Sequence, residues 1–147
     1  MNSITFLLLV GVITVALGCK CKEQTVQEAY CAAHWVSQLK VAVKVSKQPD
    51  PSGQRAGLNN IKYVKPSNVT QLATEIYTPS ESPACGLKIS SGKEYLLAGR
   101  VENGNTLFTV LCGQLIADSP TADSYEKLLE WSNVPSSTKD ALKTIKC

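Results

Sequence analysis

Hydrophobic and polar residues alternate with a period of two in the first half of the chain. From Trp35 to Val45 the odd positions are mostly apolar, with lysine and glutamine between them, which predicts a long strand with one solvent-facing side. Apolar and β-branched runs predict further strands at Asn60 to Val64, Thr74 to Thr78, Glu94 to Val101 and Thr106 to Cys112. Asn103-Gly104 suits a type I′ turn, so the last two runs should pair as a hairpin. The segment Gln48 to Gly57, rich in proline, glycine and serine, is expected to be an exposed loop.

Helix signals lie on either side of these strands. Thr25 to Glu28 forms a capping box, which predicts a short helix through about Cys31. Ser119-Pro120 opens a segment with helical spacing through Trp131, and Ser137 can cap a last helix that carries Leu142 and Ile145 on one face. The pattern therefore predicts one mainly β domain, a small closed sheet with flanking helices.

The N-terminus carries a secretion signal. A 14-residue apolar run, Ile4 to Leu17, ends in Ala16-Leu17-Gly18, whose small residues at the −3 and −1 positions predict cleavage just before Cys19. We expect residues 1–18 to be a signal peptide and residues 19–147 to be the mature domain. The run is too short to span a membrane, so a secreted, extracellular protein is expected, with a monomer as the simplest state.

Six cysteines, with the spacing C-x-C-x9-C-x53-C-x26-C-x34-C, follow the expected cleavage site. An even number in an oxidising compartment predicts three disulfides, but spacing alone leaves 15 pairings open. A zinc site of the protein's own is disfavoured, because there is no C-x2-C pair and His34 is the only histidine. No H-E-x-x-H, G-x-S-x-G or phosphate-loop motif is present, so neither an enzyme nor a cofactor of its own is expected.

Charge adds little to this prediction. The chain has 15 Lys and Arg against 12 Asp and Glu, without a block of like charge. A nucleic-acid partner is therefore not expected, and neither is a membrane partner, whereas weak binding to matrix polyanions stays open. Asn68-Val69-Thr70 is a sequon for N-glycosylation in a secreted chain, which makes Asn68 a candidate modification site.

Several of these features together resemble the inhibitory domain of the tissue inhibitors of metalloproteinases, which is netrin-like. The carriers are Cys19-x-Cys21 followed by Cys31, Ile76-Tyr77-Thr78-Pro79 shortly before Ala84-Cys85-Gly86, Tyr95 to Gly99, and the late Cys112 and Cys147. The resemblance implies an OB-type five-stranded barrel with flanking helices. It also implies the pairs Cys19 with Cys85, Cys21 with Cys112, and Cys31 with Cys147. The second, cysteine-rich domain of that family is not expected here.

What the resemblance implies about function is inhibition of zinc metalloproteinases of the metzincin type. The amine and carbonyl of the first mature residue, here Cys19, would displace the water on the protease's catalytic zinc. The binding ridge would run along Cys19, Lys20, Cys21 and Lys22 and continue through the Cys19 disulfide to Ser82 and Pro83. An N-terminal amine, with a pKa of about 7.7 to 8.0, is available in neutral form near physiological pH.

Two residues depart from the family pattern and keep other interpretations open. Lys20 stands where the family has a small Ser or Thr that enters the main specificity pocket, and Pro83 replaces a usual serine. These departures favour the runner-up hypothesis, a netrin-like extracellular binding module that does not inhibit proteases. A third hypothesis takes Ala16 to Cys19 as a lipoprotein processing site, where acylation would block the Cys19 amine.

Overall fold

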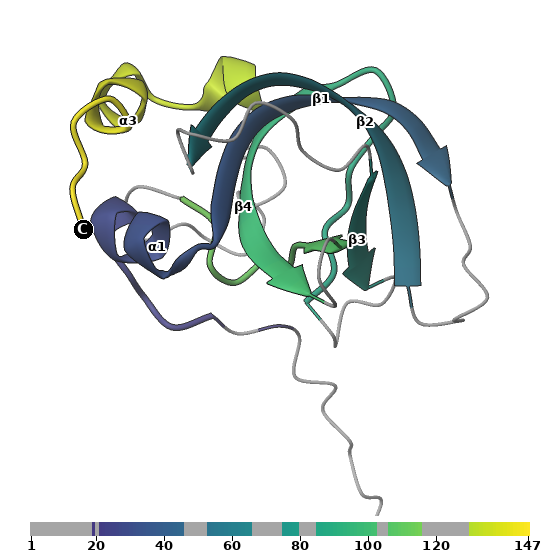
Figure 1. Ribbon diagram of the computed structural model, residues 1–147, viewed down its shortest axis with the longest axis horizontal. Helices are drawn as coiled ribbons and strands as arrows, with labels where there is room; N and C mark the ends of the chain where they lie inside the picture. Colours follow the sequence, from purple (N-terminus) through teal and green to yellow (C-terminus); the bar gives the residue numbers. More distant parts are fainter. Residues whose placement is uncertain are drawn as a thin grey trace, which may run out of the picture.

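Five strands form the body of the protein, and short helices lie at one side of it (Figure 1). The computed structural model describes residues 19, 21–45, 53–65, 75–79, 85–102, 106–115 and 130–147. The strands are β1 (Trp35–Val45), β2 (Gly53–Lys65), β3 (Glu75–Pro79), β4 (Glu94–Glu102) and β5 (Thr106–Phe108). The helices are α1 (Val26–Ala32), a 3-10 turn η2 (Trp131–Asn133) and α3 (Ser136–Ala141). The prediction of a mainly β domain with flanking helices is confirmed.

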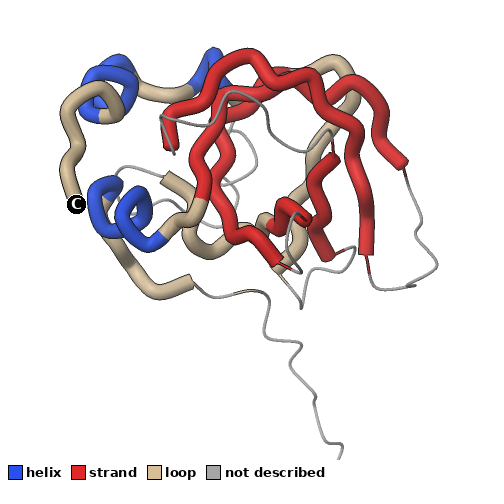
Figure 2. Tube along the Cα trace, in the orientation of Figure 1, coloured by secondary structure: helices blue, strands red, loops and turns tan. Residues whose placement is uncertain are grey.

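The strand order is β1-β2-β3-β5-β4, and β4 pairs with β1 so that the sheet closes into a barrel (Figure 2). All pairs are antiparallel except β3 with β5, in which Ile76 lies opposite Leu107 and Tyr77 opposite Phe108. The antiparallel pairing of β4 with β5 confirms the predicted hairpin, whereas the Asn103-Gly104 turn lies outside the described residues. The parallel pair brings β3 beside the end of β5, which places Cys85 and Cys112 on neighbouring segments of chain.

Two apolar clusters cover the two faces of the barrel wall. The first consists of Trp35, Leu39, Val41, Ile76, Leu87, Ile89, Tyr95, Leu97 and Leu107. The second joins the outer face of β1 and β4 to the helices through Ala29, Ala33, Val36, Leu96, Ala98, Leu115, Val134 and Leu142. Each buried large side chain of this kind stabilises the fold by about 1.5 to 3 kcal/mol.

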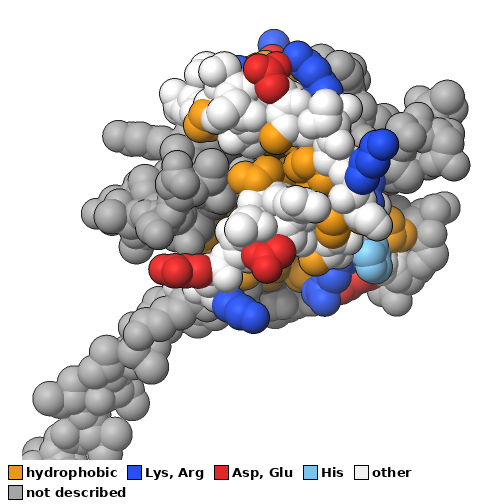
Figure 3. Space-filling model, turned by 90° about the vertical axis from the view of Figure 1, so that its left-hand side faces the viewer, with side chains coloured by type: hydrophobic (Ala, Val, Ile, Leu, Met, Phe, Trp, Pro, Cys, Tyr) orange, Lys and Arg blue, Asp and Glu red, His pale blue; other side chains and the backbone are white. Residues whose placement is uncertain are grey.

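The predicted solvent-facing side of β1 is wrong for the first part of the strand. Trp35, Val36 and Ser37 are all completely buried, and the alternation of buried and exposed residues begins only near Leu39. The reason is the second apolar cluster, which packs α1 and the C-terminal helices over the outer face of this part of β1. Figure 3 faces these helices and shows hydrophobic side chains gathered in the band between them, with charged side chains around it.

The predicted capping box is confirmed at the start of α1. Thr25 Oγ1 accepts a hydrogen bond from Glu28 N at 3.1 Å, and Glu28 Oε2 accepts one from Thr25 N at 2.8 Å. The other end of α1 is capped from β2. Lys65 Nζ donates to the carbonyl oxygens of Tyr30, Cys31 and Ala33, at 2.9, 3.2 and 2.6 Å. Since these carbonyls lack intrahelical partners, one ammonium group satisfies the end of α1 and ties it to the barrel.

Three predicted boundaries are wrong. Residues 53–57, expected in a loop, form the first part of β2, because they pair with β1 on one side and β3 on the other. The strand after residue 106 ends at Phe108 and not at Cys112, because the chain turns there toward the disulfides. Pro135 and not Ser137 is the N-cap of α3, and Ser137 lies inside the helix. The helix expected from Ser119 falls mostly outside the described residues, except that its predicted end at Trp131 lies in η2.

Three disulfides hold this arrangement, and they join Cys19 to Cys85, Cys21 to Cys112, and Cys31 to Cys147. They match the pairs that the resemblance implies. The third bond connects α1 to the last residue of the chain, so that the C-terminus lies beside α1 (Figure 1). Within the described residues, no helix is long and apolar enough to cross a membrane.

Candidate functional site

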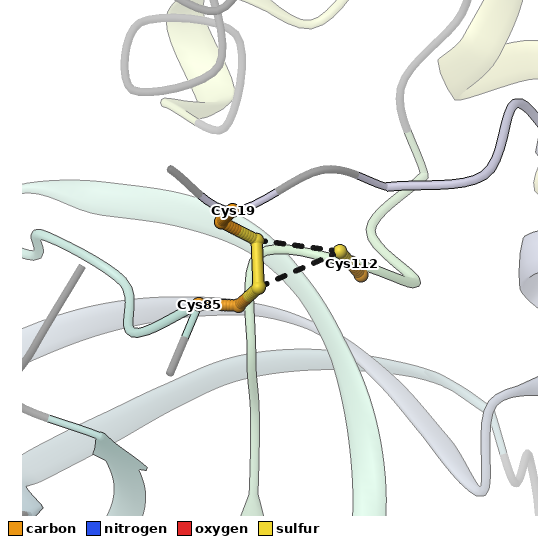
Figure 4. Close-up of side chains that lie close together, drawn as sticks. All are labelled: Cys19, Cys85 and Cys112. Atoms are coloured by element: carbon orange, nitrogen blue, oxygen red, sulfur yellow. Dashed lines mark hydrogen bonds between the residues drawn. A yellow bond between two sulfur atoms is a disulfide. The ribbon is translucent and has the colours of Figure 1, made fainter. Parts of the chain in front are cut away.

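The disulfides of Cys19 and Cys21 lie close together, and Figure 4 shows the Cys19–Cys85 bond with the sulfur of Cys112, the partner of Cys21, beside it. Cys112 Sγ is 3.5 Å from Cys19 Sγ and 3.9 Å from Cys85 Sγ, and Cys19 Sγ is 3.9 Å from Cys21 Sγ. Disulfide sulfurs carry no hydrogen, so we interpret these short distances as van der Waals packing of one disulfide on the other. We call this group of four residues, Cys19, Cys21, Cys85 and Cys112, the disulfide platform.

The segments that carry Cys85 and Cys112 are also linked through the backbone. Leu111 N donates to the carbonyl oxygen of Cys85 at 2.8 Å, so the segment that carries Cys112 is hydrogen-bonded to the segment that carries Cys85. Two residues after Cys85, Leu87 N donates to the buried hydroxyl of Thr78 at 2.9 Å. This bond holds the segment that follows Cys85 against β3. Cys85 itself has a φ of 59°, a left-handed conformation that non-glycine residues seldom adopt. The surrounding bonds therefore hold a strained backbone at the platform.

Cys112 lies in a turn that needs a glycine. Gly113 has a φ of 95°, which a residue with a Cβ atom seldom adopts. The next residue, Gln114, is 4% exposed and directs its amide back toward β4 and the start of the turn. Sequence reasoning does not single out Gln114, because a buried glutamine carries no motif and its partner Ala98 lies 16 positions away on β4.

The platform cannot hold a metal through its sulfurs. Cys19, Cys85 and Cys112 are the one grouping of potential ligand atoms found within 4.8 Å of one another in the part of the chain that the structure describes. All three are in disulfides, whereas metal binding needs a thiolate.

Charge near the platform comes from the segment that leads to α1. Lys22 is exposed, and it contributes to lowering the pKa of Glu28. The larger causes of that lowering are the hydrogen bonds from the Thr25 backbone and side chain, which favour the ionised carboxylate. Ionised Glu28 in the first turn of α1 thus helps to order the chain a few residues after Cys21.

The structure brings together some of the predicted ridge residues and leaves others undescribed. Cys19, Cys21 and Cys85 meet at the platform, and Lys22 follows on the exposed segment toward α1. Lys20, Ser82 and Pro83 lie outside the described residues, as does the glycosylation candidate Asn68. Sequence reasoning does not predict a functional role for the residues whose hydrogen bonds hold the segments of Cys85 and Cys112, which are Thr78, Leu111 and Gln114.

Comparison with known sequences agrees with this disulfide arrangement. Residues 17–117 match the sequence profile of the family described as tissue inhibitor of metalloproteinase. The chain belongs to this family. Proteins of the family are inhibitors of metalloproteinases and not enzymes, in agreement with the prediction from the missing catalytic motifs.

Relatives of this tissue inhibitor family member include proteins of similar and of greater length. A Caenorhabditis elegans protein named "Putative metalloproteinase inhibitor tag-225" is 53% identical over 99% of this chain and 98% of its own length. Metalloproteinase inhibitor 3 of Xenopus laevis is 34% identical over 73% of this chain, and metalloproteinase inhibitor 2 of Homo sapiens is 29% identical over 84%. The matched regions cover 51% and 59% of these two vertebrate proteins. The chain thus spans about half the length of the vertebrate relatives.

Proposed function

We propose that this protein is a secreted, stoichiometric inhibitor of zinc metalloproteinases, of the metzincin type, with residues 1–18 removed as a signal peptide. Its barrel is taken to be the OB-type, netrin-like barrel of the inhibitory domain. The supporting observation is the disulfide platform, in which Cys19 is bonded to Cys85 and packed against the Cys21–Cys112 bond. A chain end held in this way is preorganised, so binding costs little conformational entropy.

The proposed chemistry uses the amine and carbonyl of Cys19 after cleavage. These two groups would chelate the partner protease's zinc in place of the water that attacks a peptide substrate. The terminal amine, with its pKa of about 7.7 to 8.0, gives up its proton to a metal at little cost near neutral pH. A lysine amine, with a pKa of about 10.4, would bind less readily. No scissile peptide lies over the zinc, so the complex is not turned over.

The protease-binding ridge in this proposal comprises Cys19, Lys20, Cys21 and Lys22, with Ser82 and Pro83 on the second segment. Its supports are the disulfide from Cys19 to Cys85 and the hydrogen bond between Leu111 N and the Cys85 carbonyl. These two links tie the segments of Cys19, Cys85 and Leu111 together and restrict how far each can move. The ridge would therefore enter a protease cleft with little rearrangement.

The decisive experiment compares two forms of the protein that differ by one residue. The mature form begins at Cys19, and the second form carries one extra alanine before Cys19. We expect the mature form to inhibit at least one zinc endopeptidase at a one-to-one ratio, and the extended form to be at least 100-fold weaker, because its Cys19 nitrogen is in a peptide bond. Equal potency of the two forms would exclude chelation by Cys19.

The same panel separates the alternatives. If neither form inhibits any of a broad set of metalloproteinases, the netrin-like binding module is the better hypothesis. N-terminal sequencing of the secreted protein gives the complementary result. A free Cys19 as first residue supports the proposal, whereas an acylated Cys19 supports lipoprotein processing.

A further inference from the structure

The side chain of Gln114 takes the place of a strand beside β4. Ala98 N donates to Gln114 Oε1 at 2.9 Å, and Gln114 Nε2 donates to the Ala98 carbonyl at 3.0 Å. One amide group thus makes the two bonds that an antiparallel neighbour would make with the same residue. It does so just where β5 has ended, because the last β4 residue paired with β5 is Arg100, opposite Phe108.

The same amide closes the turn that carries Cys112. Gln114 Nε2 also lies 2.9 Å from Thr109 Oγ1 and 2.5 Å from the Val110 carbonyl. Thr109 Oγ1 gives its own hydrogen to the Ala98 carbonyl at 2.8 Å, which leaves its lone pairs free to accept. The reverse orientation of the amide would place Oε1 against two carbonyl oxygens, so the chemistry of the partners fixes it.

The part of this network that joins Gln114 to Ala98 and Thr109 is buried. Gln114 is 4% exposed, and both Thr109 and Ala98 are 1% exposed. Loss of the amide would leave the buried Ala98 N–H without the acceptor that it has in Gln114, and an unsatisfied buried donor is costly. The turn would have to open to satisfy this donor, and it contains Leu111, whose N–H holds the Cys85 carbonyl.

We propose that Gln114 is a positioning residue for inhibition, which fixes the Cys112 turn on β4 and thereby sets the place of Cys19. The inference rests on the proposed function, in which Cys19 contacts the protease. The path runs from the Gln114 amide to the Cys112 turn, then to Cys85 through Leu111 N, and to Cys19 through its disulfide. Gln114 itself touches neither Cys19 nor, in the proposal, the protease.

The test uses the mature protein with Gln114→Met, which keeps the length of the side chain but removes its hydrogen bonds. Amide hydrogen exchange of Ala98 and Leu111, measured by NMR, should become at least 10-fold faster relative to the global unfolding rate. The inhibition constant should rise at least 10-fold. The matched control is Leu142→Ala, which destabilises the second apolar cluster. It should leave both the relative exchange at Leu111 and the inhibition constant within twofold.

Thr109 supplies a second pair of variants should Gln114→Met fail to fold. Thr109→Val removes the hydroxyl and should accelerate amide exchange at Ala98. Thr109→Ser keeps the hydroxyl and should exchange at Ala98 at the wild-type rate. Unchanged relative exchange at Leu111 in Gln114→Met, or an equal rise of the inhibition constant in Leu142→Ala, would overturn the positioning role. The exchange data do not depend on a protease, so they test whether Gln114 holds the Cys112 turn separately from the proposed function.

Discussion

The Sγ atoms of Cys19 and Cys112 lie 3.5 Å apart although the residues are 93 positions apart and belong to different disulfides. Each bond therefore limits the movement of the other. Because Cys85 and Cys112 lie on two neighbouring segments that are hydrogen-bonded to each other, the first residues of the expected mature chain are bonded to two segments at once. This arrangement gives a chain end the rigidity that termini usually lack.

The disulfides should differ in what they contribute. Replacing Cys31 and Cys147 together with serine should lower the free energy of unfolding by about 2 to 4 kcal/mol, but change the inhibition constant less than threefold at a temperature where the protein is folded. Replacing Cys21 and Cys112 together should abolish inhibition, because it removes half of the platform. Denaturant unfolding and inhibition assays on both double variants check this. Equal loss of inhibition in the two would contradict a special role for the platform.

Lys20 should restrict which proteases are inhibited. An ammonium group in an apolar specificity pocket costs on the order of several kcal/mol unless it reaches water or an acid. Lys20→Thr should therefore lower the inhibition constants for proteases with deep apolar pockets at least 10-fold and broaden the range of targets. Lys22→Thr, on the exposed segment that follows Cys21, serves as the control. Constants that do not change with Lys20→Thr would show that this side chain does not enter such a pocket.

Lys65 should stabilise the protein more than an ordinary exposed lysine. Lys65→Met leaves the Tyr30, Cys31 and Ala33 carbonyls without their shared donor and should lower the free energy of unfolding by about 1 to 3 kcal/mol. Lys40→Met, on the exposed side of β1, should change it by less than about 0.5 kcal/mol. Denaturant unfolding curves measure both. Similar values for the two variants would show that the α1 carbonyls are satisfied without Lys65.

Glu28 should make α1 sensitive to acid. Its pKa is lowered from the ordinary value of 4.5 by the hydrogen bonds with Thr25, so the folded state favours the ionised form. The stabilisation is present above pH 4.5 and is lost as the pH falls through the lowered pKa. Glu28→Gln keeps a capping box without the charge, so its stability should fall less between pH 5 and pH 2 than that of the wild type, by about the Glu28 contribution.

The matched control for this titration is Glu23→Gln, which removes an exposed carboxylate just before α1. Thermal unfolding at a series of pH values gives the stability of each variant relative to the wild type. The difference between wild type and Glu28→Gln should shrink on acidification, and by more than the difference for Glu23→Gln. A constant difference for Glu28→Gln would contradict the lowered pKa.

Sequence reasoning succeeds where local pattern and tertiary pairing agree. β1 is predicted with both of its ends because most odd positions of the sequence from Trp35 to Val45 are apolar, and α1 is predicted because its cap is formed by neighbours, Thr25 and Glu28. The first part of β2 is missed because proline, glycine and serine indicate a loop, while pairing with β1 and β3 decides the outcome. Local composition does not predict such pairing with strands that are distant in sequence.

The candidate site shows the same division. Cys19, Cys21 and Lys22 are predicted as site residues from the cleavage signal and the family resemblance, both of which can be read from the sequence. The contribution of Gln114 to holding the Cys112 turn is not predicted, because Gln114 bonds to Ala98, 16 positions away on β4. The parallel pairing of β3 with β5 is equally hidden, since neither strand carries a signal for its partner.

The long sequence separation of the disulfides affects how the protein responds to proteolytic cleavage. A cut in the exposed Ser90-Ser91 turn would leave one fragment with Cys21 and Cys31 and the other with Cys112 and Cys147. Both fragments would stay covalently joined and would separate only after reduction. An inhibitor nicked there by the enzymes around it would thus keep its chain ends in place and remain one molecule.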